Sequence, residues 1–221
     1  MLYKMKSLLL FTCLLSGLVS FGYSLSCMHC QTEGELSCTG DEKKCPSENY
    51  ACAATSTISI IEGVARKTFS RSCEKRSSCG IFGTIGYLKG KVKTATSCCY
   101  ADSCTPSSPA LPVDNSQRVG LTCSSCTSQD STWCHTGETI ECTGEEKRCL
   151  FQATTTSGPK QRKSSVRGCA SKSLCDIGSQ SHDFGNGIKV TTEVTCTSSS
   201  ININQNLLVL TFIAVLSVLI I

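Results

Sequence analysis

The sequence is poor in aromatic residues, which make up 6% of its 221 residues and include a single tryptophan, Trp133. A chain with so few large apolar side chains cannot build a large hydrophobic core. Small extracellular domains with this shortage are usually held together by disulfides. We therefore expect covalent cross-links to replace much of the core.

Catalytic and metal motifs are also missing. Three histidines are present, His29, His135 and His182, and none lies in a metal-binding or hydrolase motif. No nucleophile and base can be assembled, so we predict no catalytic residue, no metal site, no cofactor and no enzymatic activity. The sequence has no Asn-x-Ser/Thr site, so no N-linked glycan is expected.

Cysteine, by contrast, is abundant, and 19 residues of this type indicate a disulfide scaffold. The pairs Cys27/Cys30 and Cys123/Cys126 have the Cys-x-x-Cys spacing of zinc sites. Zinc would need a second ligand pair at suitable spacing and reduced thiols, whereas a secreted chain keeps its cysteines oxidised. We therefore interpret these cysteines as disulfide-bonded.

Residues 1–24 form a predicted signal peptide. Lys4 and Lys6 precede an apolar run, and the small residues Gly22 and Ser24 fit cleavage after Ser24. Cleavage would remove Cys13 and leave 18 cysteines, an even number, in an oxidising compartment.

The C-terminus has the features of a lipid-anchor signal. Residues 207–221 are apolar, shorter than the ~20 residues of a spanning helix, and followed by no basic residue. A polar spacer precedes them, and Ser198, Ser199 and Ser200 supply small residues before the spacer. These features predict a glycosylphosphatidylinositol (GPI) anchor at Ser198, with 199–221 removed as a propeptide. A short C-terminal membrane span is the alternative.

The charge of the mature chain is nearly balanced. Without Lys4 and Lys6, 19 of the 21 basic residues remain against 17 acidic residues, a net charge of +2. Such a balance excludes nucleic acid as an expected partner.

The cysteines repeat in two sets. The gaps between the eight cysteines from Cys27 to Cys98 are 2, 7, 6, 6, 20, 5 and 18 residues, and those between the eight from Cys123 to Cys196 are 2, 7, 7, 6, 19, 5 and 20. Gaps that agree within two residues indicate an internal repeat, and therefore two domains of one type. We place domain one at 25–105 and domain two at 121–198, joined by a proline-containing, semi-extended linker at 106–120.

The long cysteine gaps predict β-hairpins. Residues 51–72 are rich in threonine, serine and isoleucine and contain a turn signal at Glu62 and Gly63. The second copy repeats this pattern at 150–168, and 188–195 alternate between two faces. No segment between the terminal signals has a helical period, so we expect no helix there.

The opening Leu-Ser-Cys-Met-His-Cys at 25–30 and the closing Cys-Cys-Tyr-Ala-Asp-Ser-Cys at 98–104 resemble the LU domain, which lymphocyte antigen 6 proteins share with the urokinase receptor. With two domains in tandem and Arg-Gly-Cys-Ala-Ser-Lys-Ser-Leu-Cys at 167–175, the chain looks most like gamma-type phospholipase A2 inhibitors and their surface-anchored relatives. The resemblance implies an all-β, small, disulfide-rich fold of two tandem three-finger domains, in which β-hairpin fingers project from a disulfide knot.

The resemblance also implies the disulfide pairing, which the number of cysteines leaves open. In domain one it implies Cys27–Cys52, Cys30–Cys38, Cys45–Cys73, Cys79–Cys98 and Cys99–Cys104. In domain two it implies Cys123–Cys149, Cys126–Cys134, Cys142–Cys169 and Cys175–Cys196. Domain two lacks the family's final pair, and Thr105 stands where the family usually has an asparagine packed in the knot.

Two clusters of basic residues are candidates for binding. Lys160, Arg162 and Lys163 lie at the predicted tip of the second finger of domain two, where they would either bind an acidic partner or remain solvated. Three alternating lysines at 89–93 share one face of the last strand of domain one. For these lysines we favour protection of an edge strand over attraction of a partner.

The leading functional hypothesis is recognition of an extracellular protein ligand by a protein on the outer face of the plasma membrane. The GPI anchor would hold it there, and cleavage of the anchor would release it as a secreted protein. The second hypothesis, implied by the two-domain resemblance, is inhibition of secreted phospholipase A2. A structural coat protein is a third, and an enzyme is disfavoured because no catalytic set is present.

Overall fold

The computed structural model describes residues 24–185 and 187–198. The predicted propeptide at 199–221, and all but the last residue of the predicted signal peptide, lie outside this range. No helix within the described ranges is both long enough and apolar enough to cross a membrane. The elements are β1 (Ser26–Glu33), β2 (Asp41–Lys44), β3 (Tyr50–Ile61), β4 (Val64–Lys75), η1 (Arg76–Ser78), β5 (Phe82–Tyr87), β6 (Gly90–Cys99), β7 (Arg118–Ser124), β8 (Cys126–Ser128), β9 (Thr139–Thr143), β10 (Arg148–Ser157), β11 (Arg162–Ala170), α2 (Lys172–Ile177), β12 (Gln180–Gly185) and β13 (Ile188–Thr197).

Domain one consists of three antiparallel hairpins, β1–β2, β3–β4 and β5–β6, which pair in the order β5-β6-β3-β4-β1-β2. The predicted long hairpin is confirmed, because β3 and β4 pair continuously from Tyr50 with Lys75 to Ile61 with Val64. Its turn residues Glu62 and Gly63 both have positive φ, 50° and 82°. Two left-handed residues in a two-residue turn match the right-handed twist of the flanking strands.

Domain two repeats this plan with a rearranged first finger. The predicted second and third fingers are confirmed as β10–β11 and β12–β13, and β13 pairs with β10 along nine residue pairs. In the first finger, β7 and β9 form a separate two-stranded sheet, whereas β8 pairs with β11. The first finger is therefore divided between two sheets.

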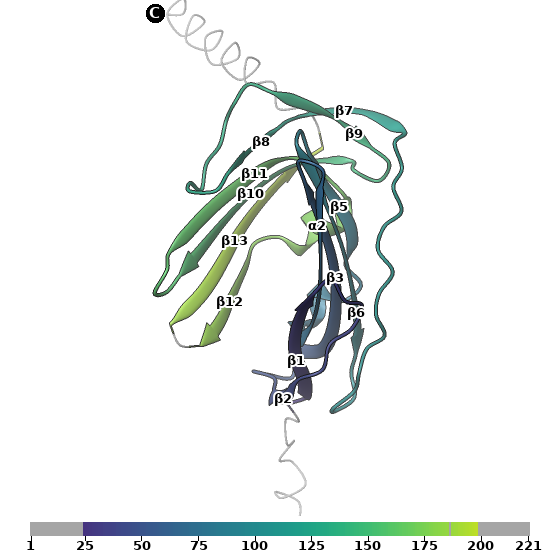
Figure 1. Cartoon of the computed structure of the whole chain (residues 1–221), viewed down its shortest axis with the longest axis vertical. Coiled ribbons are helices and arrows are strands. Elements are labelled where there is room, and N and C mark those ends of the chain that lie inside the picture. The colour runs from purple at the N-terminus through teal and green to yellow at the C-terminus, as the bar shows by residue number, and fades with distance from the viewer. Residues whose placement is uncertain (1–23, 186, 199–221) are drawn as a thin grey trace, which may run out of the picture.

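One sheet runs through both domains. Cys169 and Ala170 of β11 pair with Gly86 and Ile85 of β5, so the sheet continues from β12 to β2 across the domain boundary. Figure 1 shows the hairpins of domain two and the sheet of domain one diverging from this junction like the arms of a V.

Nine disulfides join all 18 cysteines of the described residues, in the pairing that the family resemblance implies. Each domain has a small buried cluster made mostly of cysteines rather than large apolar side chains. Phe69 is the largest fully buried side chain among the described residues. The disulfide-rich, all-β prediction is confirmed.

One local expectation is wrong. The six residues Lys172–Ile177 form a short helix, α2, although no helix was expected. It is too short to show a helical period, so its pattern was not visible in the sequence. The segment predicted as a semi-extended linker runs along the sheet of domain one (Figure 1), and its Pro106 and Pro112 are buried.

Candidate functional site

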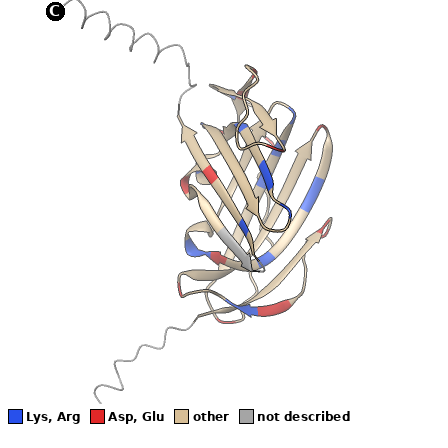
Figure 2. Cartoon of the chain, turned by 90° about the vertical axis from the view of Figure 1, so that its left-hand side faces the viewer, with Lys and Arg blue, Asp and Glu red and all other residues tan. Residues whose placement is uncertain are grey.

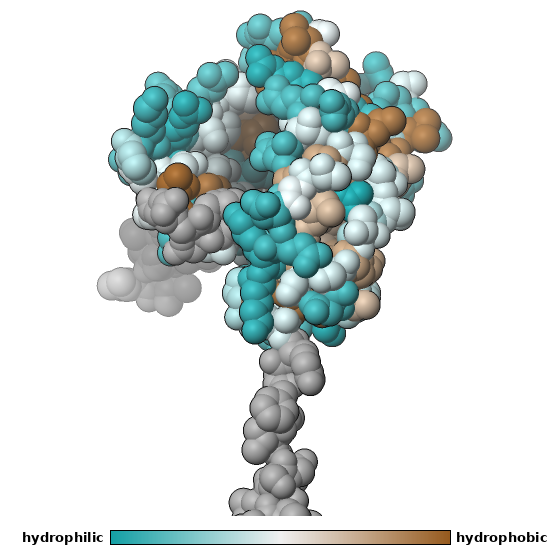
Figure 3. All heavy atoms as spheres, turned by 60° about the horizontal axis from the view of Figure 1, so that its bottom comes forward, coloured by the Kyte–Doolittle hydropathy of each residue, from teal (hydrophilic) through white to brown (hydrophobic). Residues whose placement is uncertain are grey.

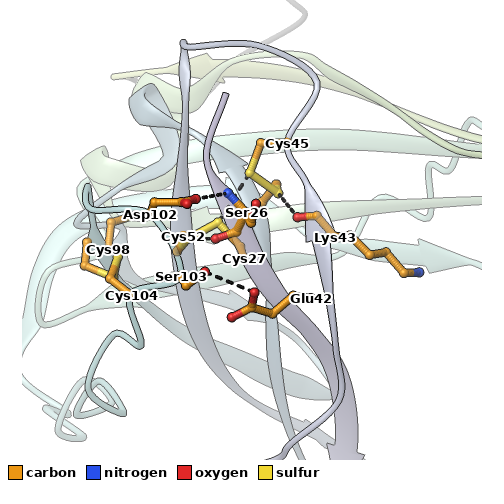
Figure 4. The surroundings of a disulfide bond; sticks show 12 residues. Ser26, Cys27, Glu42, Lys43, Cys45, Cys52, Cys98, Asp102, Ser103 and Cys104 are labelled. Atoms are coloured by element: carbon orange, nitrogen blue, oxygen red, sulfur yellow. Dashed lines mark hydrogen bonds between the residues drawn. A yellow bond between two sulfur atoms is a disulfide. The ribbon is translucent and has the colours of Figure 1, made fainter. Parts of the chain in front are cut away.

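The knot of domain one fixes the base of its fingers. The Cys27–Cys52 and Cys45–Cys73 disulfides lie side by side, with 3.3 Å between the Sγ atoms of Cys27 and Cys45. Asp102 accepts a hydrogen bond from the backbone N–H of Ser26 at 2.7 Å, and Ser103 Oγ donates to Glu42 at 3.0 Å (Figure 4). The C-terminal loop of domain one is thereby tied to its first finger.

Thr105, which stands in place of the family's knot asparagine, is exposed. Asp102 and Ser103 therefore connect the loop and the first finger without it. Three sulfurs of each knot lie within 4.8 Å of one another, close enough to resemble a metal-binding cluster. All of them belong to disulfides, and a disulfide offers no thiolate to a metal ion. Both clusters are structural.

Backbone and hydroxyl groups join the domains beside the shared sheet. The backbone N–H of Thr84 donates to Ser171 Oγ at 2.8 Å, and the N–H of Ser171 donates to Thr84 O at 3.0 Å. The N–H of Leu88 donates to Ser125 Oγ at 2.8 Å. Thr84, Ser171 and Ser125 are buried, so these hydrogen bonds are shielded from water and hold the domains in one orientation.

A partly buried ion pair crosses the same junction. Lys91 Nζ lies 3.4 Å from Oε1 of Glu146, a domain-two residue that is only 2% exposed. The predicted role of the lysines at 89–93 as guards of an edge strand is wrong, because β6 pairs with β3 on one side and β5 on the other. Lys89 alone stays exposed, 3.9 Å from Glu62.

The third lysine of this row, Lys93, binds the linker. Its buried ammonium group lies 2.5 Å from Asp114 Oδ2, and this hydrogen bond holds the pKa of the Asp114 carboxyl below its usual range. Arg71 donates to the backbone oxygen of Pro106 at 3.2 Å, and Ser97 Oγ donates to that of Ser107. The linker is thus fixed to domain one at several points.

A cleft of about 300 Å³ lies between the two domains on the inner side of the V. Ile81 and Ile85 of domain one meet Leu150, Leu174 and Val194 of domain two around it. Figure 3 shows this hollow, with hydrophobic residues at its base and mainly hydrophilic residues on its walls. The cleft could accept an apolar side chain of a partner.

The walls of the cleft are rich in threonine. Thr55 and Thr96 of domain one pair through their hydroxyls at 3.0 Å, and Thr154 and Thr192 of domain two pair at 3.4 Å. Such cross-strand hydroxyl pairs stabilise the two sheets and leave their facing surfaces polar.

The predicted basic tip of the second finger is exposed. Lys160, Arg162 and Lys163 are all accessible, and none forms an ion pair within the described residues. However, Arg162 and Lys163 are adjacent on β11 and therefore point to opposite faces of the sheet. Figure 2 shows basic and acidic residues interspersed over the strands and turns rather than one uniformly basic surface.

An aromatic and cationic cluster that we did not predict lies on domain two. The Arg167 guanidinium carbon is 4.2 Å from the centroid of the Trp133 ring and 4.4 Å from that of Phe151. Burial between the rings lowers the pKa of Arg167. The signal available in the sequence was the single tryptophan, in a chain otherwise poor in aromatic residues.

Ser198, the predicted anchor residue, is exposed and is the last described residue. It follows β13, which ends at Thr197. The Ser198 side chain is therefore accessible, as attachment of a lipid anchor would require.

Two units of three fingers, each built on a disulfide knot, define a tandem three-finger protein. Residues 23–107 and 119–204 each match the u-PAR/Ly-6 domain, so the chain belongs to the u-PAR/Ly-6 domain family. Members of this family are binding proteins without enzymatic activity. The sequence-based assignments of family and of non-enzymatic class are confirmed.

Known relatives cover most of the chain. It is 32% identical to phospholipase A2 inhibitor NAI of Notechis ater over 78% of this chain and 86% of that protein. It is 30% identical to a gamma-type phospholipase A2 inhibitor of Laticauda semifasciata, over 69% of this chain and 85% of that protein.

More distant similarity extends to a receptor and a solved structure. The urokinase plasminogen activator surface receptor of Bos taurus is 29% identical over 71% of this chain and 48% of the receptor. The crystal structure of mouse TEX101 matches with 15% identity and a TM-score of 0.35, covering 77% of this chain and 96% of that chain.

Proposed function

We propose that this protein is a cell-surface recognition protein that binds an extracellular protein ligand through domain two. The observation that carries the proposal is the β10–β11 hairpin, whose tip exposes Lys160, Arg162 and Lys163 without ion-pair partners among the described residues. Basic groups at an exposed tip attract an acidic partner and accelerate its association.

The base of this hairpin supports a binding role because it is fixed on several sides. Cys169 is bonded to Cys142 and pairs with Gly86 of domain one, and Cys149 is bonded to Cys123. A loop held on a rigid base loses little conformational entropy when it binds, which favours affinity.

The proposal includes membrane attachment. The signal peptide at 1–24 would be removed, 199–221 would be exchanged for a GPI anchor at Ser198, and the protein would stand on the outer face of the plasma membrane. A protein so anchored has no cytoplasmic residues, so any signal must pass through a partner in the same membrane. Phosphatidylinositol-specific phospholipase C should release it from cells, whereas retention with 207–221 still present would indicate a membrane span.

The ligand is to be captured with the soluble ectodomain, residues 25–198. Replacing Lys160, Arg162 and Lys163 with Glu should slow association with the captured ligand and change its salt dependence. A matched control reverses three basic residues of domain one that are exposed and form no ion pair within the described residues, Lys43, Lys44 and Arg66. Equal on-rates for the wild type and both variants would show that the tip is only solvated surface.

Inhibition of secreted phospholipase A2 is the second candidate function. It rests on the similarity to two proteins named as phospholipase A2 inhibitors, which this chain matches over about 70–80% of its length. A direct assay of the ectodomain against secreted phospholipase A2 tests it. Full enzyme activity at a large molar excess of ectodomain would remove this candidate and leave the recognition function standing.

A further inference from the structure

The sheet of domain two has an inner and an outer face that differ in chemistry. Even-numbered residues of β10, such as Leu150 and Gln152, line the cleft between the domains. Odd-numbered residues, such as Phe151 and Thr155, line two hollows of about 360 and 500 Å³ on the opposite face. We call this opposite side, with Trp133, Phe151, Lys163, Arg167 and Glu193, the outer face.

One end of the outer face is a rigid cationic and aromatic cluster. Arg167 lies against the Trp133 and Phe151 rings, whose centroids are 5.4 Å apart, and its Nε donates to Cys134 O at 3.0 Å. Trp133 nevertheless remains 61% exposed. Tryptophan and arginine are the residues that most often dominate binding energy in protein interfaces.

The charges of the outer face follow a pattern along β11. Lys163 and Arg167 are four residues apart, which corresponds to about 13 Å along a strand. Neither forms an ion pair within the described residues. Glu193 occupies an intermediate row, because it pairs with Ala153, between the rows of Phe151 and Thr155.

We propose that the outer face binds an extended acidic segment of a protein partner. The segment places an apolar side chain against Trp133 and Phe151 and carboxylates, four residues apart, over Arg167 and Lys163. An uncharged residue of the segment passes Glu193. This inference rests on the proposed recognition function and specifies the chemistry of its ligand.

Glu193 distinguishes a protein segment from an anionic membrane. A membrane surface presents negative charge continuously, so phosphate groups opposite Glu193 would be repelled. A peptide chooses its residue at each position and can avoid this repulsion. Charge complementarity therefore favours a segment with spaced acidic residues.

The first test selects peptides from a library of random dodecapeptides displayed on phage, using the ectodomain 25–198 as bait. Selected sequences should contain Asp or Glu at positions four apart and an apolar residue near one of them. A parallel selection on the Arg167→Gln, Lys163→Gln ectodomain should lose this acidic pattern. Selected peptides without acidic residues, or the same pattern from both baits, would overturn the proposal.

The second test uses Trp133 as its probe, because no other tryptophan contributes to the fluorescence of the protein. A synthetic peptide from the selection should change Trp133 fluorescence saturably. Arg167→Gln should raise its Kd by about tenfold, as expected for loss of a charged hydrogen-bonding group. Glu193→Gln should lower the Kd, because it removes the remaining longer-range repulsion between Glu193 and the peptide carboxylates on either side. This exposed position carries little risk for folding.

The matched control is Arg66→Gln in domain one, an exposed arginine without an ion pair within the described residues, which should leave the Kd unchanged. An equal loss in the Arg66 and Arg167 variants, or weaker binding by the Glu193 variant, would overturn the proposal. So would a fluorescence change with phosphatidylcholine–phosphatidylserine vesicles but not with the peptide. If wild type and Arg167→Gln capture a partner equally well, the outer face is not the binding site, and the proposed function remains intact. If the wild type captures no partner, that result counts against the proposed function.

Discussion

The third fingers of the two domains share a cysteine pattern but differ in how they are held. In domain one, β5 pairs with β11 of the other domain and β6 pairs with β3. In domain two, β12 is the edge of the sheet and pairs only with β13 among the described strands. The Cys99–Cys104 disulfide also closes the end of domain one, and no described disulfide follows Cys196.

This comparison shows that a shared disulfide frame does not set local stability alone. Opening the third finger of domain one breaks pairing to both neighbours, whereas opening β12 breaks pairing to one. Regions with fewer neighbours open at lower free energy than the rest of a protein. We therefore expect domain two to hold the less protected end of the molecule.

The largest effect should come from Gly168→Ala, which disrupts the pairing of β11 with β5. The strand β5 then loses its neighbour in domain two. A Cβ at Gly168 would lie 2.1 Å from Gly86 O, a clash with backbone that no side chain can relieve. We expect a loss of about 3 kcal/mol of unfolding free energy and faster hydrogen exchange in β5. Denaturant titration and exchange mass spectrometry measure both, with Ser164→Ala on the same strand as control. Unchanged exchange in β5 would show that β11 does not protect it.

Removing one disulfide from each third finger gives the next effect. Alanine pairs in place of Cys175–Cys196 or Cys79–Cys98 should each cost about 2–3 kcal/mol of stability. In the first variant, local exchange in β12 should rise steeply, whereas in the second β5 should remain protected by its neighbours. Similar increases in both strands would mean that the disulfides alone hold these fingers.

A smaller difference should be visible in the wild-type protein. Residues 191–198 should exchange their amide hydrogens earlier than 94–104, because no described disulfide ties down the C-terminal end of domain two. Exchange mass spectrometry of the ectodomain at neutral pH resolves both segments. Equal protection would contradict the predicted difference between the domains.

The smallest effect concerns the linker and its attachment to domain one. Because the hydrogen bond from Lys93 lowers the pKa of Asp114, this contact contributes stability at neutral pH and loses it as pH falls through the lowered pKa. Asp114 is largely exposed, so the contribution should be at most about 1 kcal/mol. Unfolding midpoints between pH 6 and pH 2 should show this loss, and Asp114→Asn should show less of it. An identical pH profile in the variant would rule out the contact as a source of stability.

The features predicted from sequence depend on local signals. The turn at Glu62 and Gly63, the strands on either side and the exposed position of Lys160 follow from residue types within a few positions of one another. The cysteine spacing, compared with the family, gave the two-domain plan. These features can be predicted without knowing how the two domains contact each other.

The features that were missed depend on contacts between distant residues. The ion pair of Lys91 with Glu146 and the packing of Arg167 on Trp133 join segments that no periodicity connects. The alternation of lysines at 89–93 was identified correctly, but it could not reveal that β6 lies inside the sheet. The residues of a strand and its sequence neighbours do not show which other strands will pair with it in the sheet.

The docked linker has a consequence for assembly. The junction between β5 and β11 could also form between two molecules, if domain two of each molecule paired with domain one of the other. The contacts of Arg71 with Pro106 and of Lys93 with Asp114 shorten the free length of chain between the domains. A short tether raises the effective concentration of each domain for its own neighbour. The linker therefore favours pairing within one chain over domain swapping between chains.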